Sequence, residues 1–240
     1  MRYQPFIWMN YFYKRAFFFY KPLYFFYKRI CDRKKISLIK KNVKEGMTVL
    51  DIGANIGFYT ILLSKLVGHS GLVIAYEPEM QNFYNLKNIC RNRKNINLRP
   101  VACSNKSGSL SLYFSEHMNI DHQTFDSGEG RFFQDIPCIA IDDDLDESQN
   151  IGFIKIDIQG YDYHALLGMK RTFQRSNELT LLGEFWPYAL KKAGVEPGDY
   201  IHFLEELGFK LCFFHGETDP LNPDKLMDKY YYTDFYASKG

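Results

Sequence analysis

The sequence predicts an α/β fold in which an open, mostly parallel sheet carries helices on both faces. Residues 49–60, VLDIGANIGFYT, read as the end of a buried strand, a glycine-rich turn and the first turn of a helix. A second apolar run, LVIAY at residues 72–76, is followed by the acid–proline pair Glu77-Pro78. Through the rest of the 240 residues, short apolar runs alternate with segments whose apolar residues have helical spacing. Such alternation is typical of a doubly wound sheet. The glycine turn marks the corner where a sheet of this kind holds a ligand.

The remaining elements follow from periodicity and from turn residues. Phe58 opens a helix that continues to Val67, and residues 78–90 place Phe83, Leu86 and Cys90 on one helical face. Residues 115–137 show no clear period and predict an inserted loop or lid. The pattern predicts further strands at residues 96–103, 110–114, 138–141, 153–158 and 179–185, a helix at 200–207, and a final antiparallel pair at 209–214 and 231–237.

The spacing of the glycine turn distinguishes it from a dinucleotide site. Asp51, Gly53, Asn55 and Gly57 follow the pattern D-x-G-x-N-x-G instead of G-x-G-x-x-G. Glycines let the backbone approach a ligand closely, but the carboxylate of Asp51 does not suit a pyrophosphate, which binds uncovered N–H groups. The Asp51 carboxylate suits a ligand that carries a cationic ammonium and sulfonium. Taken alone, Asp51 could also be a helix-capping or loop carboxylate. The pattern resembles the first motif of S-adenosylmethionine (SAM)-dependent methyltransferases.

A second acid, Glu77, follows the next predicted strand. A carboxylate at this strand tip accepts hydrogen bonds from both ribose hydroxyls of a nucleoside. We therefore expect SAM to bind across the turn, with its ribose on Glu77 and its adenine near Pro78 and the turn at residues 102–103. The expected cofactor-binding residues are Asp51, Gly53, Ala54, Asn55, Gly57, Phe58, Thr60, Glu77, Pro78, Ala102, Cys103 and Asp157.

The N-terminal part of the chain differs sharply in charge from the rest. Residues 1–45 hold twelve Lys and Arg against Asp32 and Glu45, a local net charge of +10, whereas the remainder carries −8. Fourteen of the first 27 residues are aromatic. Lys and Arg residues interleaved with aromatic residues suit an anionic membrane surface, and residues 1–36 are expected to dock on such a surface. The alternatives are helices packed on the domain with a solvated basic face, and binding of nucleic acid.

These observations divide the chain into a basic, aromatic, helical extension at residues 1–44 and an α/β domain at residues 45–240. The uncharged run Tyr3–Tyr13 is too short to span a bilayer. The five cysteines are scattered, odd in number and without C-x-x-C spacing, which indicates a reducing compartment. No signal peptide is evident. We expect a cytoplasmic protein that is peripheral at the membrane if its N-terminus docks.

Six short motifs in succession make the resemblance to one family specific. VLDIGANIGFYT, AYEP, VACSNKSG, IDDDL, FIKIDIQGYD and EFWP occur in this order, and the succession resembles the FkbM-type SAM-dependent methyltransferases over residues 45–240. The resemblance implies a class I, Rossmann-like methyltransferase fold with a seven-stranded sheet, and O-methylation of sugar or other secondary-metabolite hydroxyls. The chain departs from the family at Gln159, where an acid is usual, and at Asn119–Gln123, which lacks the family's glycine and arginine.

Methyl transfer to a hydroxyl needs a positioned acceptor, a base and the exclusion of water. Asp157 ends the fourth predicted strand on the side where such sheets bind ligands, and Glu184 ends the neighbouring strand. One of these acids could act as base, or both could hold a divalent cation; the plainer alternative is that they cap helices. His122 is the other candidate base, since imidazole titrates near neutrality, or else an ordinary loop histidine. We favour a metal-independent or weakly metal-assisted reaction, because Phe185 occupies the position of the second acid that a firm magnesium site needs.

Two other functions compete with O-methylation. A nucleic-acid methyltransferase could use the basic N-terminal segment, but amino methylation of bases usually relies on a (D/N)-P-P-(Y/F) segment, and this chain has IDIQGYD there. A non-catalytic, membrane-associated partner protein could retain the fold without the activity. The presence of both Asp51 and Glu77 in an intact turn argues against such a decayed site. We expect a small-molecule, glycan or lipid-linked hydroxyl acceptor and no nucleic acid.

Overall fold

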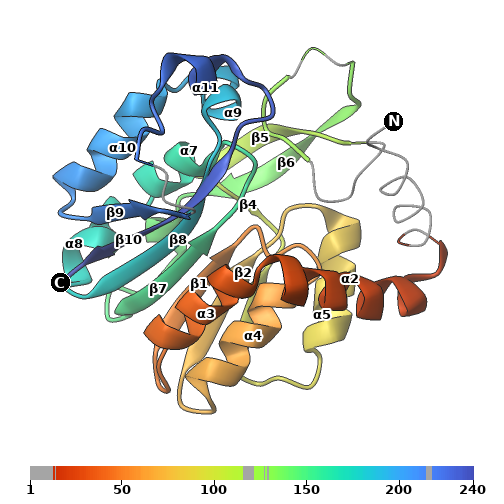
Figure 1. The fold of residues 1–240 in the computed structure, drawn as a ribbon. Helices are drawn as coiled ribbons and strands as arrows, with labels where there is room; N and C mark the ends of the chain where they lie inside the picture. The colour runs from red at the N-terminus through yellow and green to blue at the C-terminus, as the bar shows by residue number, and fades with distance from the viewer. Residues whose placement is uncertain (1–12, 14, 116–121, 127, 129, 215–217) are drawn as a thin grey trace.

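The structure is a computed structural model, and it describes residues 13, 15–115, 122–126, 128, 130–214 and 218–240. Among these residues, seven strands form a main sheet in the order β3-β2-β1-β7-β8-β10-β9 (Figure 1). β10 is antiparallel to both of its neighbours, and the other pairs are parallel. The strands are β1 (Thr48–Ile52), β2 (Leu72–Tyr76), β3 (Ile96–Arg99), β7 (Ile151–Ile156), β8 (Leu179–Phe185), β9 (Lys210–Phe213) and β10 (Thr233–Lys239). The predicted α/β class and the terminal antiparallel pair are confirmed.

Both faces of the sheet are buried, which explains why its central strands read as unbroken apolar runs. Val49 and Phe153 belong to the hydrophobic cluster on one face, and the next residues, Leu50 and Ile154, belong to the cluster on the other. One face is covered by α2 (Phe17–Cys31), α3 (Arg33–Asn42), α4 (Phe58–Val67) and α5 (Met80–Cys90) (Figure 1). The other face packs against α6 (Ile141–Asp144), α7 (Asp162–Leu167), α8 (Lys170–Arg175), α9 (Pro187–Lys192) and α10 (Pro197–Glu206). The short helix α11 (Pro223–Met227) contacts α9.

The strand predicted at residues 96–103 is two strands in two different sheets. β3 ends at Arg99, and β4 (Ala102–Cys103) joins a separate three-stranded sheet with the order β4-β6-β5. Pro100 lies at the break, where its missing N–H removes a donor that a continuing strand needs. The predicted strand at 153–158 is also shorter, since β7 ends at Ile156.

The second sheet replaces part of the predicted loop. β5 (Gly108–Tyr113) pairs antiparallel with β6 (Phe133–Ile139), so the last five residues of the expected insert, 133–137, are strand rather than loop. Ile136 and Cys138 are buried while the residues between and before them are exposed, which is the alternation of a half-buried strand. The strand predicted at 138–141 therefore ends early, and Ile141 begins α6. The predicted motif at 119–121 lies outside the described residues.

The N-terminal helices α2 and α3 pack against the rest of the chain. Tyr20, Tyr24 and Ile39 are buried in the same cluster as Phe58 and Leu63 of α4. The ring of Phe25 meets that of Phe58 edge-on, with 5.3 Å between ring centroids. Figure 1 shows α2 crossing α4 and α5. Among the described helices, none is long and apolar enough to cross a membrane.

Candidate functional site

The turn between β1 and α4 has a backbone that its glycines make possible. Gly53 has a φ of +77°, and a Cβ there would lie 2.1 Å from the carbonyl oxygen of Asp157. Gly57 has a φ of +91°, and a Cβ there would lie 2.6 Å from Leu86 Cδ1 of α5. Asn55 between them adopts a φ of 49°. Strain and close contacts exclude a side chain at both glycines. The turn therefore stays close to β7, and its backbone on the cavity side is left open to a ligand.

Three of the predicted cofactor-binding residues lie beneath the turn instead of on the cavity wall. Asp51 is fully buried within β1, and its carboxylate accepts a hydrogen bond of 2.6 Å from Thr60 Oγ1 and lies 3.5 Å from Lys155 Nζ. The third, Gly57, packs against α5. Asp51 therefore meets a cation of the protein itself, where the sequence predicted a cationic ligand. Lys155 in turn donates to the carbonyl oxygen of Gly53 at 2.8 Å, so this buried pair holds the turn from below.

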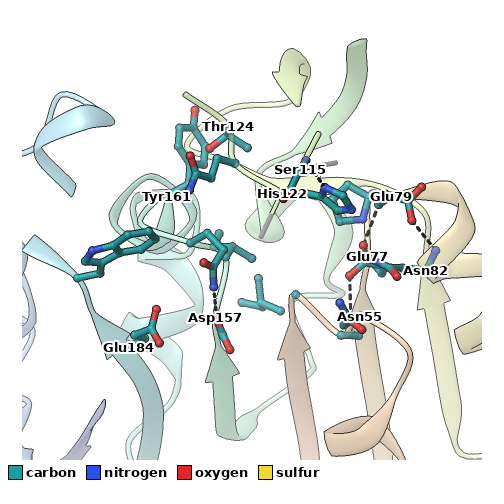
Figure 2. Close-up of a pocket in the computed structure, with 18 of the residues that line it drawn as sticks. Asn55, Glu77, Glu79, Asn82, Ser115, His122, Thr124, Asp157, Tyr161 and Glu184 are labelled. Atoms are coloured by element: carbon teal, nitrogen blue, oxygen red, sulfur yellow. Dashed lines mark hydrogen bonds between the residues drawn. The ribbon is translucent and has the colours of Figure 1, made fainter. Parts of the chain in front are cut away.

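Glu77 is the buried carboxylate directly beside the turn. Its Oε2 accepts from the backbone N–H of Asn55 at 2.7 Å, and its Oε1 accepts from the N–H of Glu79 at 3.0 Å. Each oxygen keeps a further lone pair for a ligand. Burial raises the pKa of the Glu77 carboxyl to about 7, although the two backbone N–H groups lower it. Figure 2 shows Glu77 and Asn55 together at the ends of neighbouring strands.

A large cavity runs along the carboxyl ends of the central parallel strands. Its volume is about 1220 Å³, more than one drug-sized ligand requires, so it has room for a cofactor and an acceptor side by side. One end is lined by the turn and by β2 and β4. The predicted residues that line the cavity are Gly53, Ala54, Asn55, Phe58, Glu77, Pro78, Ala102, Cys103, His122, Asp157 and Glu184.

Two carboxyl groups whose pKa values shift in opposite directions line the cavity beyond the turn. Asp157 follows β7 and Glu184 lies near the end of β8, as Figure 2 shows. Burial would raise the pKa of the Asp157 carboxyl, but the ammonium groups of Lys155, Lys35 and Lys28 bring it below its usual value. Burial, and next the charge of Asp157, raise the pKa of the Glu184 carboxyl well above its usual range. The two pKa values thus shift in opposite directions, which favours the ionised form of Asp157 and the protonated form of Glu184, as in acid and base pairs.

His122 lies on the cavity wall but its ring is already engaged. Its Nδ1 accepts a hydrogen bond of 3.1 Å from the N–H of Ser115, and its ring contacts Phe114 edge-on. A neutral imidazole whose Nδ1 accepts carries its proton on Nε2, so it has no second lone pair for an acceptor proton. In Figure 2 His122 lies toward Glu77 and Glu79, apart from Glu184. Of the candidate bases, His122 is thus the one whose acceptor nitrogen already has a hydrogen-bond partner in the protein.

The comparison with known proteins identifies the family. A model of the methyltransferase FkbM domain matches residues 51–211. The chain belongs to the FkbM methyltransferase family. It is similar to the methyltransferase FkbM of Methylobacillus flagellatus KT, with 17% identity and a TM-score of 0.50, over 80% of this chain and 43% of that one. A Streptococcus mutans protein described as a methyltransferase and solved with SAH matches with 13% identity and a TM-score of 0.53, over 87% and 97% of the two chains.

Among curated proteins, this FkbM family member is similar to protein-L-isoaspartate O-methyltransferase 1 of Arabidopsis thaliana. The identity is 30% over 83 residues, 34% of this chain and 33% of the relative, so the match spans about a third of that relative's length. The structural likenesses show the class I methyltransferase fold, and the family model makes residues 51–211 a SAM-dependent methyltransferase domain.

The residues of this FkbM domain fit SAM. The turn at Gly53 provides the open backbone, and Glu77 provides two acceptor oxygens for a ribose. Pro78 and the small side chains of Ala102 and Cys103 line the cavity beyond Glu77, where a flat apolar base could pack. These residues would hold the nucleoside, and Asp157 lies between this end of the cavity and Glu184 (Figure 2).

Sequence reasoning missed three charged residues of the site. Lys155 had a visible signal, since it is a single cation inside the otherwise apolar strand FIKI. Lys35 of α3 and Asp234 of β10 both line the cavity, yet they come from near the two ends of the chain. Only the folded topology brings them to Asp157.

The affinity for SAM should depend on pH through Glu77. The ionised carboxylate is the form that accepts both ribose hydroxyls, and with a pKa of about 7 it is mostly protonated at pH 6. We expect calorimetry to show about tenfold tighter binding at pH 8 than at pH 6. Glu77→Gln should remove this rise and bind at pH 8 about tenfold more weakly than wild type. Any pH dependence of the affinity that remains in this variant belongs to the titration of SAM itself. An equal pH dependence in both proteins would contradict the assignment of Glu77 to the ribose.

Proposed function

We propose that this protein transfers a methyl group from SAM to a hydroxyl, most fittingly of a sugar, glycan or glycolipid. The observation that carries the proposal is the pair of unlike carboxyl groups at the far end of the cavity. The lowered pKa of the Asp157 carboxyl favours the ionised form, which can accept a proton, and the raised pKa of the Glu184 carboxyl favours the protonated form, which can donate a hydrogen bond. A hydroxyl is both donor and acceptor, so it can use both groups at once.

The protein's own part in the reaction is orientation and proton removal. SAM supplies the electrophilic methyl group when it is bound. Asp157 accepts the acceptor's proton as that oxygen gains a bond, and Gln159 Nε2 donates to Asp157 Oδ1 at 3.0 Å, which fixes the direction of the carboxylate. Glu184 holds the acceptor oxygen from the other side. Tyr24 and Tyr27 of α2 line the cavity and limit the access of water.

The aromatic residues of the cavity support a sugar as the acceptor. Rings with a polar tip pack against the apolar faces of a sugar while they bond to its hydroxyls. The Trp186 ring is held in place, because its Nε1 donates to the carbonyl oxygen of Lys229 at 3.0 Å. The aromatic residues that line the cavity near β7, β8 and β10 are Tyr161, Trp186, Tyr188, Tyr230 and Tyr232.

The test is a transfer assay with methyl-labelled SAM, free sugars, glycolipids in vesicles, and RNA. We expect label in a sugar-containing acceptor that survives mild alkali, because a methyl ether is stable where a methyl ester is hydrolysed. Label released by alkali would show a carboxyl acceptor, and label in RNA would show a nucleic-acid acceptor; either result would contradict the proposal.

We propose further that the N-terminal segment 1–36 places the enzyme on an anionic membrane surface. Phe19, Leu23, Phe26 and Ile30 of α2 are 56–64% exposed and recur at i, i+4, i+7 and i+11, so they form one apolar stripe on the outer face of the helix. Arg29 beside the stripe is exposed, as are other bases of the segment. An apolar stripe with a basic flank is the pattern of an interfacial helix.

The same vesicles test this membrane proposal by flotation. We expect the protein to float with vesicles that contain phosphatidylglycerol, not with pure phosphatidylcholine, and to be released by high salt. Leu23→Glu/Phe26→Glu should abolish flotation without loss of SAM binding. Tyr84→Glu is the control, because Tyr84 of α5 is also 62% exposed but lies outside the stripe. Flotation that persists in the double variant would contradict a role for α2.

A further inference from the structure

The N-terminal segment supplies a charged side chain to the active site. Lys35 of α3 forms an ion pair with Asp234 of β10, with 2.6 Å between Nζ and Oδ1, and both side chains are 18% exposed. Both residues lie outside the matched domain, at opposite ends of the chain. They nevertheless line the cavity together with Asp157 and Glu184.

The position of Asp234 in the sheet explains why a cation is needed there. Asp234 of β10 is the direct antiparallel partner of Glu184 of β8. Two acids directly opposite each other on such strands repel when both are ionised, and Asp157 adds a third carboxylate at the end of the next strand. The Lys35 ammonium is placed against this group from the helix layer.

Lys35 is itself held in place by contacts between the N-terminal helices and the core. Asp32, at the junction of α2 and α3, accepts a hydrogen bond of 2.6 Å from the Tyr59 hydroxyl of α4 and forms an ion pair with Lys28. Because Tyr59 is buried, this contact fixes the start of α3 one turn before Lys35. The ammonium therefore reaches the acceptor end from a defined position.

We propose that Lys35 is a positioning residue of the active site, which holds the acceptor-binding carboxylates Asp157 and Glu184 through its ion pair with Asp234. The N-terminal segment is then part of the catalytic unit and not only an extension. The inference rests on the proposed function for the identity of the acceptor-binding acids, but its main test does not need an acceptor.

The charges around Lys35 give the direction of the effect. Burial would lower the pKa of the Lys35 ammonium, but Asp234 and Asp157 raise it above its usual value, so it stays charged. Lys35 in turn lowers the pKa of the Asp157 carboxyl. The titratable groups that face this cluster from the surrounding elements are Lys28, Asp32, Tyr59, Lys155, Asp157, Glu184, Tyr232 and Asp234.

The experiment is a site-resolved titration of the Asp157 side chain by carbon-13 NMR on the full chain. In Lys35→Met the titration of Asp157 should move upward by about one pH unit, because a nearby positive charge is lost. In Asp234→Asn it should move downward, because a negative charge is lost. In Lys35→Arg the Asp157 side chain should titrate as in wild type. A merely structural role would not give opposite shifts in the first two variants.

Turnover and cofactor affinity complete the test. With an acceptor found in the transfer assay, Lys35→Met should lower kcat about tenfold with SAM affinity unchanged, and Lys35→Arg should restore it. If Lys35→Met does not fold, the titration of Asp157 is measured in Lys35→Gln, where the same upward shift is expected. An Asp157 titration that coincides with wild type in a folded Lys35 variant overturns the inference. If no acceptor is found, only the proposed function fails, and the titration still decides the role of Lys35.

Discussion

Asp157→Asn should reduce turnover by about a hundredfold or more while the affinity for SAM stays within a few-fold. In the proposed reaction this carboxylate accepts the acceptor's proton, and general-base catalysis typically contributes a factor of about a hundred to ten thousand. Asparagine keeps the size of the side chain and one oxygen that can accept from Gln159 Nε2. The loss should therefore appear in kcat and not in folding, and single-turnover kinetics with calorimetry of SAM binding would separate the two.

His122→Ala is the informative comparison for this prediction. The sequence offered His122 and Asp157 as alternative bases, and the structure leaves the His122 ring with its Nδ1 bonded to the Ser115 N–H. We expect the His122 variant to lose much less turnover than Asp157→Asn. The reverse order would transfer the role of base to His122 and remove Asp157 from the mechanism.

The parts of the site that the sequence predicts are those that local backbone geometry controls. Gly53 and Gly57 are required by positive φ and by close packing, and both requirements show directly as glycines after an apolar run. Glu77 follows from its place at the tip of the second parallel strand, because all such tips meet at one edge of the sheet. Family and cofactor could be inferred from these residues and the order of the motifs.

The parts that the sequence does not predict depend on where side chains point and on contacts distant in the chain. Asp51 was expected to meet a ligand, but it lies within β1 with its side chain toward Thr60 and Lys155. The register of a strand relative to its helices decides this, and no local pattern encodes it. The Lys35–Asp234 pair forms only when the first helices and the last strand have both joined the sheet.

Gly53→Ala should damage folding and both halves of the active site together. The new Cβ would lie 2.1 Å from the Asp157 carbonyl oxygen and 2.9 Å from Ile158 Cγ2, in a backbone with a φ of +77°. Strain of this kind costs on the order of 1–3 kcal/mol, and the clash adds to it because the nearer atom is backbone. For a domain of this size a loss of about 3 kcal/mol lowers Tm by about 6–12 °C.

The clash in Gly53→Ala also links stability to function. To relieve it, the turn expected to hold SAM and the strand end that carries Asp157 must move apart. A displacement of about 1 Å at a reacting centre can cost about a hundredfold in rate. Gly194→Ala is the matched control: Gly194 has a φ of +79°, yet no other atom lies within 4 Å of a Cβ placed there. The control should show the backbone strain alone, with SAM binding intact. Equal Tm losses and equal SAM affinities in the two variants would mean that the turn does not depend on its contact with Asp157. A larger Tm loss in Gly53→Ala, together with weakened SAM binding, would show that this contact couples the cofactor site to the proposed base.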